Sequence, residues 1–245
     1  MKMPRAWLLA LSLALSLAFS LAFFSLLFAA TRAQAADVPR YRITIPSGAA
    51  RQDPGGVVQF FGTATALLRV RGLSVLIDPG IDGDALPHDM ARADLVLLSN
   101  PDWQGMAAVG WSARPVVAMT GTAERLRSHG VHSVYPLDTW EGITVRKGDT
   151  RLRLTSMPDP RGLRPALMAA MLDFGPGCRV LVNHGELSAA EIGLIPQRFP
   201  GARLALLRQA GTPLLLAMDK DGREPVPSHP VARGEPYRFG TPTCQ

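Results

Sequence analysis

The chain has few of the features that mark the common kinds of protein chemistry. It contains only two cysteines, Cys178 and Cys244, and two isolated cysteines do not make a zinc motif. It also lacks a glycine-rich phosphate loop, a Gly-x-Ser-x-Gly nucleophile elbow and a Cys-His pair at a recognisable spacing. The sequence therefore gives no support for a zinc finger, a nucleotide hydrolase of the P-loop type or a serine hydrolase.

Strong charge of one sign is missing as well. The formal net charge is +6, and the N-terminal segment contributes Lys2, Arg5 and Arg32 with no acidic residue, so the rest of the chain carries +3. This small excess is spread along the chain, which excludes nucleic acid as an expected partner.

The N-terminal residues have the pattern of an export signal. Lys2 and Arg5 precede an uncharged apolar run from Trp7 to Ala30, and Ala33-Gln34-Ala35 follows as a small-x-small cleavage site. We therefore expect residues 1–35 to be a signal peptide and the protein to be periplasmic or secreted. The apolar run is also long enough to span a bilayer, so an uncleaved anchor that holds the domain at a membrane is the alternative.

Both cysteines lie in the part of the chain that would be exported, where an oxidising compartment permits a disulfide. A bond between them would tie the C-terminal tail to the body and would be worth about 4 kcal/mol for a loop of this size. Two unpaired thiols are the other interpretation, and the spacing does not decide between them.

About 210 residues remain after the signal, a normal size for one domain. Short apolar or alternating runs predict strands over 41–45, 57–61, 65–70, 73–77, 94–99, 115–118, 150–155, 166–174, 179–183, 203–207 and 214–218. Arg71-Gly72 suits a hairpin turn. A helix is expected over 122–129, ending at Gly130, and a second should begin at the capping box Ser188-Ala-Ala-Glu191.

This order of elements predicts two packed sheets with helices outside them rather than one doubly wound sheet. The expected boundaries are a domain over 36–223 and a proline-rich tail over 224–245 that lies across the surface.

Polar groups follow three of the predicted strands. Asn100, Asp102 and Gln104 come after 94–99, Asp159 comes after 150–155, and His184-Gly185-Glu186 comes after 179–183. Strand ends that open into loops commonly hold working residues, although Asn, Asp and Gly are also ordinary turn formers. Trp103, Trp111 and Trp140 are candidates either for lining an apolar pocket or for packing in the core or a lid.

Several blocks of sequence resemble a known superfamily. "VVQFFGTATALLRVRGLSVLIDPG", "ADLVLLSNPDWQGM", "RLRLTSMPDP" and "CRVLVNHGEL" are similar in order and spacing to the metallo-β-lactamase-like superfamily, nearest its lactonase-like branch. The resemblance covers roughly Val57 to Met218. It implies an α/β fold, a four-layer αββα sandwich, in which histidines and aspartates hold one or two metal ions that activate water.

The metal-binding loop of that superfamily has different residues in this chain. Asn100 and Asp102 stand at its first two histidine positions, Gln104 at its aspartate, Gly105 at its third histidine, Asp159 near the later histidine and Glu186 at the bridging aspartate. None of the four expected histidines is present. The resemblance then implies metal ligands at Asn100, Asp102, Asp159 and Glu186, which offer oxygen atoms that suit Mg²⁺, Mn²⁺ or Ca²⁺ better than Zn²⁺.

The same correspondence makes Asp102 an expected catalytic residue, while Asp78 and Gln104 would support the metal loop without touching the ion. His184, which lies beside the Gly-Glu turn, is the second expected catalytic residue, as a ligand or general base; its other interpretation is a strand-end residue bonded to a backbone carbonyl. Asp78 is equally interpreted as the turn residue before Pro79. Two functions stay open at this point. The first is a metal-dependent hydrolase of a small ester, lactone or phosphoester. The second is a non-catalytic binding or scaffolding protein that has kept the fold and lost the metal.

Overall fold

The computed structural model describes residues 39–47, 55–80, 92–100, 114–158, 168–218 and 229–239. The chain divides into Met1–Val38 and Pro39–Gln245, and every described residue belongs to the second unit. Within the described ranges, no helix combines the length and the hydropathy that a membrane crossing requires.

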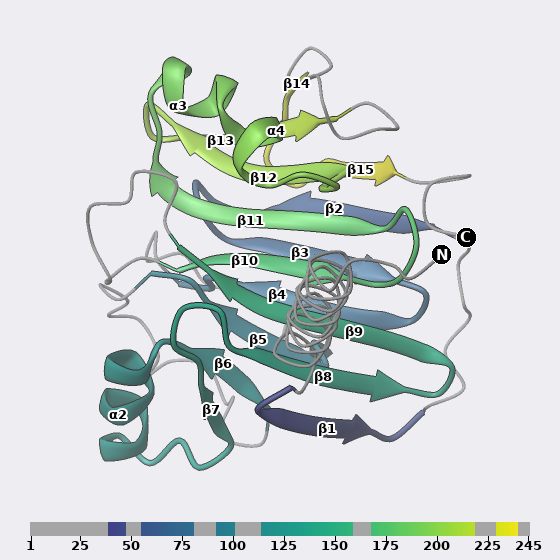
Figure 1. Ribbon diagram of the computed structural model, residues 1–245, viewed down its shortest axis with the longest axis vertical. Coiled ribbons are helices and arrows are strands. Elements are labelled where there is room, and N and C mark those ends of the chain that lie inside the picture. The colour runs from purple at the N-terminus through teal and green to yellow at the C-terminus, as the bar shows by residue number, and fades with distance from the viewer. Residues whose placement is uncertain are drawn as a thin grey trace, which may run out of the picture. The chain divides into compact units, whose positions relative to one another are not determined.

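The strands form two sheets (Figure 1). The seven-stranded sheet contains, in spatial order, β15 (Pro236–Phe239), β2 (Gly56–Phe60), β3 (Ala66–Val70), β4 (Leu73–Ile77), β5 (Leu95–Leu98), β6 (Val116–Ala118) and β7 (Val134–Pro136). Its strands β4 to β7 run parallel, whereas β15, β2, β3 and β4 alternate in direction. The hairpin between β3 and β4 turns at Arg71 and Gly72, both with positive φ, which confirms the predicted turn.

The eight-stranded sheet contains, in spatial order, β1 (Tyr41–Ile45), β8 (Gly142–Lys147), β9 (Thr150–Met157), β10 (Ala169–Asp173), β11 (Arg179–Glu186), β12 (Leu204–Gln209), β13 (Thr212–Ala217) and β14 (His229–Pro230). Strands β1 and β8 pair in parallel, as do β11 and β12, and the other neighbours are antiparallel. The proline-rich C-terminal segment thus supplies one edge strand to each sheet, β14 and β15.

The two sheets face each other across one apolar core. Alternate side chains of each strand point inward, so residues such as Phe60 and Ile77 of one sheet join Ile143, Leu154 and Leu206 of the other in a single buried cluster. Strand β5 is buried along its whole length, as expected for a parallel strand covered on both faces.

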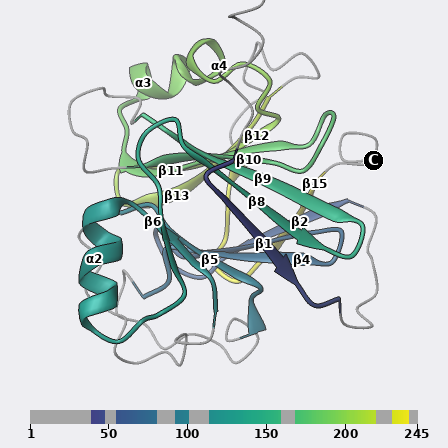
Figure 2. The ribbon, with the colours of Figure 1, turned by 60° about the horizontal axis from the view of Figure 1, so that its bottom comes forward.

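Helices cover the outer faces of both sheets. Helix α2 (Thr120–Ser128) packs Ala123 and Leu126 on the outer face of the seven-stranded sheet. The short helices α3 (Ala189–Gly193) and α4 (Ile195–Arg198) lie over the other sheet, where Ile195 and Phe199 join its outer apolar cluster (Figure 2). These contacts confirm the predicted order of layers, helix, sheet, sheet and helix.

The helix ends follow from local chemistry. The hydroxyl of Ser188 accepts the N–H of Glu191 and the Glu191 carboxylate accepts the N–H of Ser188, so the predicted capping box is confirmed. Helix α2 ends before Gly130, whose φ of +84° terminates the helix without strain.

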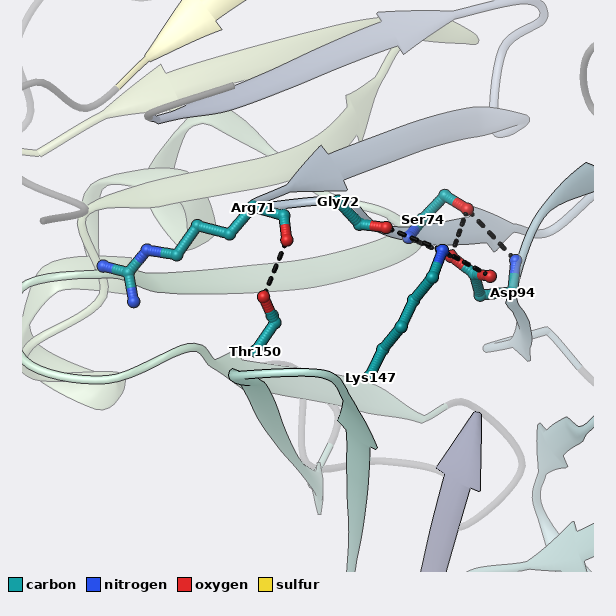
Figure 3. Close-up of polar contacts among 6 residues, drawn as sticks. All are labelled: Arg71, Gly72, Ser74, Asp94, Lys147 and Thr150. Atoms are coloured by element: carbon teal, nitrogen blue, oxygen red, sulfur yellow. Dashed lines mark hydrogen bonds and ion pairs between the residues drawn. The ribbon is translucent and has the colours of Figure 1, made fainter. Parts of the chain in front are cut away.

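A polar contact joins the two sheets at one end of the sandwich (Figure 3). Nζ of Lys147, on β8, lies 2.7 Å from Oδ2 of Asp94, immediately before β5. The same ammonium group donates to the carbonyl of Gly72, and the hydroxyl of Thr150 donates to the carbonyl of Arg71. The turn between β3 and β4 is therefore bonded to the turn between β8 and β9.

Cys178 lies between β10 and β11 and is fully buried in the core between the sheets. It is disulfide-bonded. The chain's other cysteine, Cys244, lies outside the described residues.

Candidate functional site

The candidate site lies at the opposite end of the sandwich from Lys147, where β4 and β5 finish. The backbone N–H of Met168, just before β10, donates to the carbonyl of Ser99, just after β5, at 3.1 Å. This bond brings the ends of the two sheets together at one edge. Because β4 to β7 are parallel, their carboxyl ends all open at that edge.

Asp78 holds the beginning of the loop that follows β5. It is fully buried, and its Oδ1 accepts the backbone N–H of Ser99 at 2.6 Å while its Oδ2 accepts the Ser99 hydroxyl. The Thr65 hydroxyl donates to the carbonyl of Asp78 at 2.8 Å. Asp78 also has a φ of +40°, a left-handed conformation that Asp tolerates better than most residues. We call this arrangement the Asp78–Ser99 clasp.

The clasp also reaches Asn100, the first residue of the loop that the resemblance assigns to metal binding. The N–H of Asn100 points toward Oδ1 of Asp78 at 3.4 Å, and the residue is half-buried. Asp102, Gln104 and Asp159 lie outside the described residues, as does the side chain of His184. Their expected roles as ligands, supporting residue or catalytic groups stay predictions.

Glu186 ends β11, and its carboxylate is engaged by the neighbouring strand. Nε of Arg208, on β12, lies 3.2 Å from Oε2 of Glu186. The N–H is not aimed at that oxygen, so the contact is an ion pair rather than a hydrogen bond. The N–H of Gly211, in the turn between β12 and β13, reaches both carboxylate oxygens at 3.2 and 3.4 Å.

The described donors do not make a metal centre. Of the four expected ligands, the structure describes the side chains of Asn100 and Glu186, and the second is paired with the cation Arg208. Across the ranges that are described, no three His, Cys, Asp or Glu side chains lie together in a way that could hold a metal ion. An amide and a carboxylate already neutralised by arginine fall short of the oxygen-rich shell that Mg²⁺, Mn²⁺ or Ca²⁺ requires.

Sequence reasoning did not detect the unusual backbone of Trp140 in the loop between β7 and β8. Its φ is +73° and its side chain is 67% exposed, whereas every other large hydrophobic side chain in the described ranges is at least partly covered. A left-handed conformation costs a residue with a Cβ about 1–2 kcal/mol. Neither Gly nor Asn stands there to indicate it, so the sequence carried no local signal.

The loop around Trp140 is held by charged and backbone contacts. Arg40 forms a hydrogen bond with the Glu141 carboxylate, which raises the pKa of the arginine above its ordinary value, and lies 3.9 Å from Asp138. The N–H of Trp140 donates to the carbonyl of Ser156 at 2.8 Å, and the N–H of Ser156 donates to the carbonyl of Glu141 at 2.9 Å. The strained residue therefore sits on a fixed part of the chain.

Comparison with known proteins identifies similar folds. No family model matches the chain, and no curated protein matches it. Among solved structures, isothiocyanate hydrolase from Delia radicum gut bacteria is 17% identical, covers 70% of this chain and 76% of its own, and gives a TM-score of 0.45. A metallo-β-lactamase from Cronobacter sakazakii is 13% identical, with 64% and 79% covered and a TM-score of 0.39.

The diiron β-hydroxylase CmlA from Streptomyces venezuelae is 21% identical over 54% of this chain, with a TM-score of 0.38, and the match spans 30% of the length of CmlA. The two facing sheets with helices outside them are the arrangement that the sequence resemblance predicts. The described strands and helices form a four-layer sandwich, helix, sheet, sheet and helix. At these identities and TM-scores the solved structures indicate no function, and the chemistry has to be argued from the side chains of this chain.

Proposed function

We propose that the chain is an exported, non-catalytic binding protein that keeps a metallo-β-lactamase-type fold without the metal centre. One observation supports this above others. Glu186, the carboxylate at the position of the bridging aspartate, is neutralised by Arg208 and by the N–H of Gly211. Both partners come from this chain, and a metal ion would have to compete with them for the carboxylate.

The sequence supports the same proposal. The positions that would carry histidines are Asn100, Asp102 and Gly105, and one of these has no side chain to offer. The Asp78–Ser99 clasp still orders the edge of the sandwich, so the fold can present a binding surface there. A scaffold of this kind needs its strand ends and loops in place, and it does not need an activated water molecule.

Elemental analysis of the mature protein, purified without refolding, tests the proposal. The expected result is far less than one equivalent of any transition metal, Mg²⁺ or Ca²⁺, unchanged in Glu186→Gln and in its matched partner variant Arg208→Gln. A stoichiometric metal that Glu186→Gln loses and Arg208→Gln retains, together with metal-dependent turnover, would exclude a non-catalytic protein.

A second candidate is a hydrolase of a small ester, lactone or phosphoester, assisted by Mg²⁺, Mn²⁺ or Ca²⁺. It is favoured by the Asp78–Ser99 clasp, because the clasp fixes Ser99, the residue after which the resemblance expects the metal-binding loop to begin. Wild type and Asp102→Ala would be compared across a panel of such substrates. Identical background rates for the two proteins would eliminate this candidate.

A further inference from the structure

Trp140 is the only exposed large hydrophobic side chain among the described residues. A single exposed apolar residue is ordinary on a protein surface, so exposure alone carries no function. The backbone makes this position different. At a φ of +73° the chain accepts an unfavourable conformation that glycine would adopt freely, and the exposed indole recovers little of that cost by packing.

Contacts in the surrounding loop fix the position of the Trp140 backbone. Arg40 pairs with both Asp138 and Glu141 beside it, and the Thr120 hydroxyl donates to Asp138 at 2.6 Å. The most exposed apolar group that this loop offers to another molecule is the side chain of Trp140.

The loop belongs to the same edge as the candidate site. The N–H of Trp140 bonds to Ser156 on β9, and Ser156 pairs with Ala170 on β10. Met168, two residues before Ala170, bonds to Ser99 of the clasp. Since neighbouring strands lie about 4.8 Å apart, the backbone of Trp140 is about 10 Å from β10. The backbone that carries the indole thus lies at the same edge as the start of β10 and as Ser99, where β5 ends.

We propose that Trp140 is the contact residue for an apolar or aromatic ring of a small-molecule ligand that binds at this edge. The inference rests on the proposed binding function and adds its ligand class, a ring-bearing molecule recognised by stacking and apolar contact rather than by charge. Tryptophan is well suited to this role because it offers a large, rigid contact area at a small loss of conformational entropy.

The test uses N-phenyl-1-naphthylamine, an uncharged aromatic probe made of a phenyl and a naphthyl group, which the chain's arginines do not attract by charge. We expect saturable binding to the mature wild-type protein, seen as a rise in probe fluorescence and energy transfer from tryptophan. Trp140→Ala should bind at least tenfold more weakly, and Trp140→Phe should stay within about threefold of wild type because the ring is kept. Thr139→Ala, an exposed neighbour on the same loop, is the matched control and should bind like wild type.

Trp140→Gly distinguishes loss of probe binding from loss of the fold. Glycine relieves the positive φ, so this variant should unfold at a temperature no lower than that of Trp140→Ala while it also loses probe binding. The proposal is overturned if the wild type shows no saturable probe binding, or if Trp140→Ala and Trp140→Gly bind like wild type. Metal content and turnover, measured on the same preparations, test the proposed function separately, because a metal-dependent enzyme could still use Trp140 as a contact.

Discussion

The ammonium group of Lys147 lies between both carboxylate oxygens of Asp94, at 2.7 and 2.8 Å, and so links β8 of one sheet to the start of β5 in the other (Figure 3). Their side chains are 16% and 9% exposed, so the pair is largely removed from water. The N–H and the hydroxyl of Ser74 also donate to Asp94, at 2.9 and 2.8 Å. Both oxygens of Asp94 thus accept hydrogen bonds, which is the condition for a buried ion pair to be tolerated.

Removing either charge of this pair should be costly. Lys147→Met leaves a buried carboxylate without its cation, and Asp94→Asn leaves a buried ammonium without its anion, so each should lower the free energy of unfolding by about 3 kcal/mol. The double variant should lose clearly less than the sum, because neither charge is then left alone. Urea denaturation of the wild type, the two single variants and the double variant measures the coupling free energy between the two charges. Additive losses would mean that the two groups act independently.

The Asp78–Ser99 clasp predicts a specific cost for a nearly isosteric change. Asp78→Asn keeps the side-chain shape and tolerates the positive φ, but it replaces one of the two acceptor oxygens by an NH₂ group, which cannot accept the bond from Ser99 that this oxygen accepted. We expect a loss of about 2 kcal/mol of unfolding free energy. Asp149→Asn, the same change at an exposed turn residue, should be within about 0.5 kcal/mol of wild type. Equal effects at the two positions would argue against the clasp.

The strands were predictable where the pattern was local. Residues 73–77 formed the predicted strand because Leu73, Val75 and Ile77 point into the core and a two-residue turn precedes them. The prediction for 214–218 was off at its ends, since β13 begins at Thr212. Strand β7 was missed because three residues are too few to show a period. Strand β8 was also missed, although Ile143 and Val145 alternate with Thr144 and Arg146, so its signal was present in the sequence.

At the candidate site, contacts between residues that are distant in sequence were not predictable. Asp78 was assigned a supporting role for the metal loop, and that role stays a prediction, while its bonds to Ser99, 21 residues along the chain, were not predicted. The pairing of Glu186 with Arg208 was not predictable, because it depends on β11 and β12 lying side by side in parallel with a register shift before Glu186. Likewise, the strain at Trp140 arises from a loop fixed by Arg40 and Ser156, neither of which is near it in sequence.

A pair of like charges on the outer face of the eight-stranded sheet should respond to salt. Arg146 on β8 pairs directly across from Arg151 on β9, and both are exposed. Like charges directly opposite on neighbouring strands repel, so Arg151→Glu should stabilise the protein by about 0.5 kcal/mol at low ionic strength. The gain should shrink at 1 M salt, where the screening length falls to about 3 Å.

Arg238→Glu is the matched control for this change. Arg238 is an exposed strand residue opposite Val57, so the substitution alters the net charge equally but creates no cross-strand ion pair. It should not reproduce the stabilisation. A gain of the same size in both variants would assign the effect to net charge instead of to the pair on β8 and β9.

The disulfide at Cys178 predicts the behaviour of the C-terminal tail. Cys178 is disulfide-bonded within a chain that has one other cysteine, so a digest of the mature protein under non-reducing conditions should contain a single linked peptide pair with Cys178 and Cys244. Reduction should lower the free energy of unfolding by up to about 4 kcal/mol, because the bond limits the freedom of the unfolded chain. Cys244→Ser should unfold like the reduced wild type and be insensitive to reductant. A free thiol at Cys178 in the native protein would contradict the bond, and it would leave β14 and β15 held by strand pairing and by the packing of Tyr237 and Phe239 on the core.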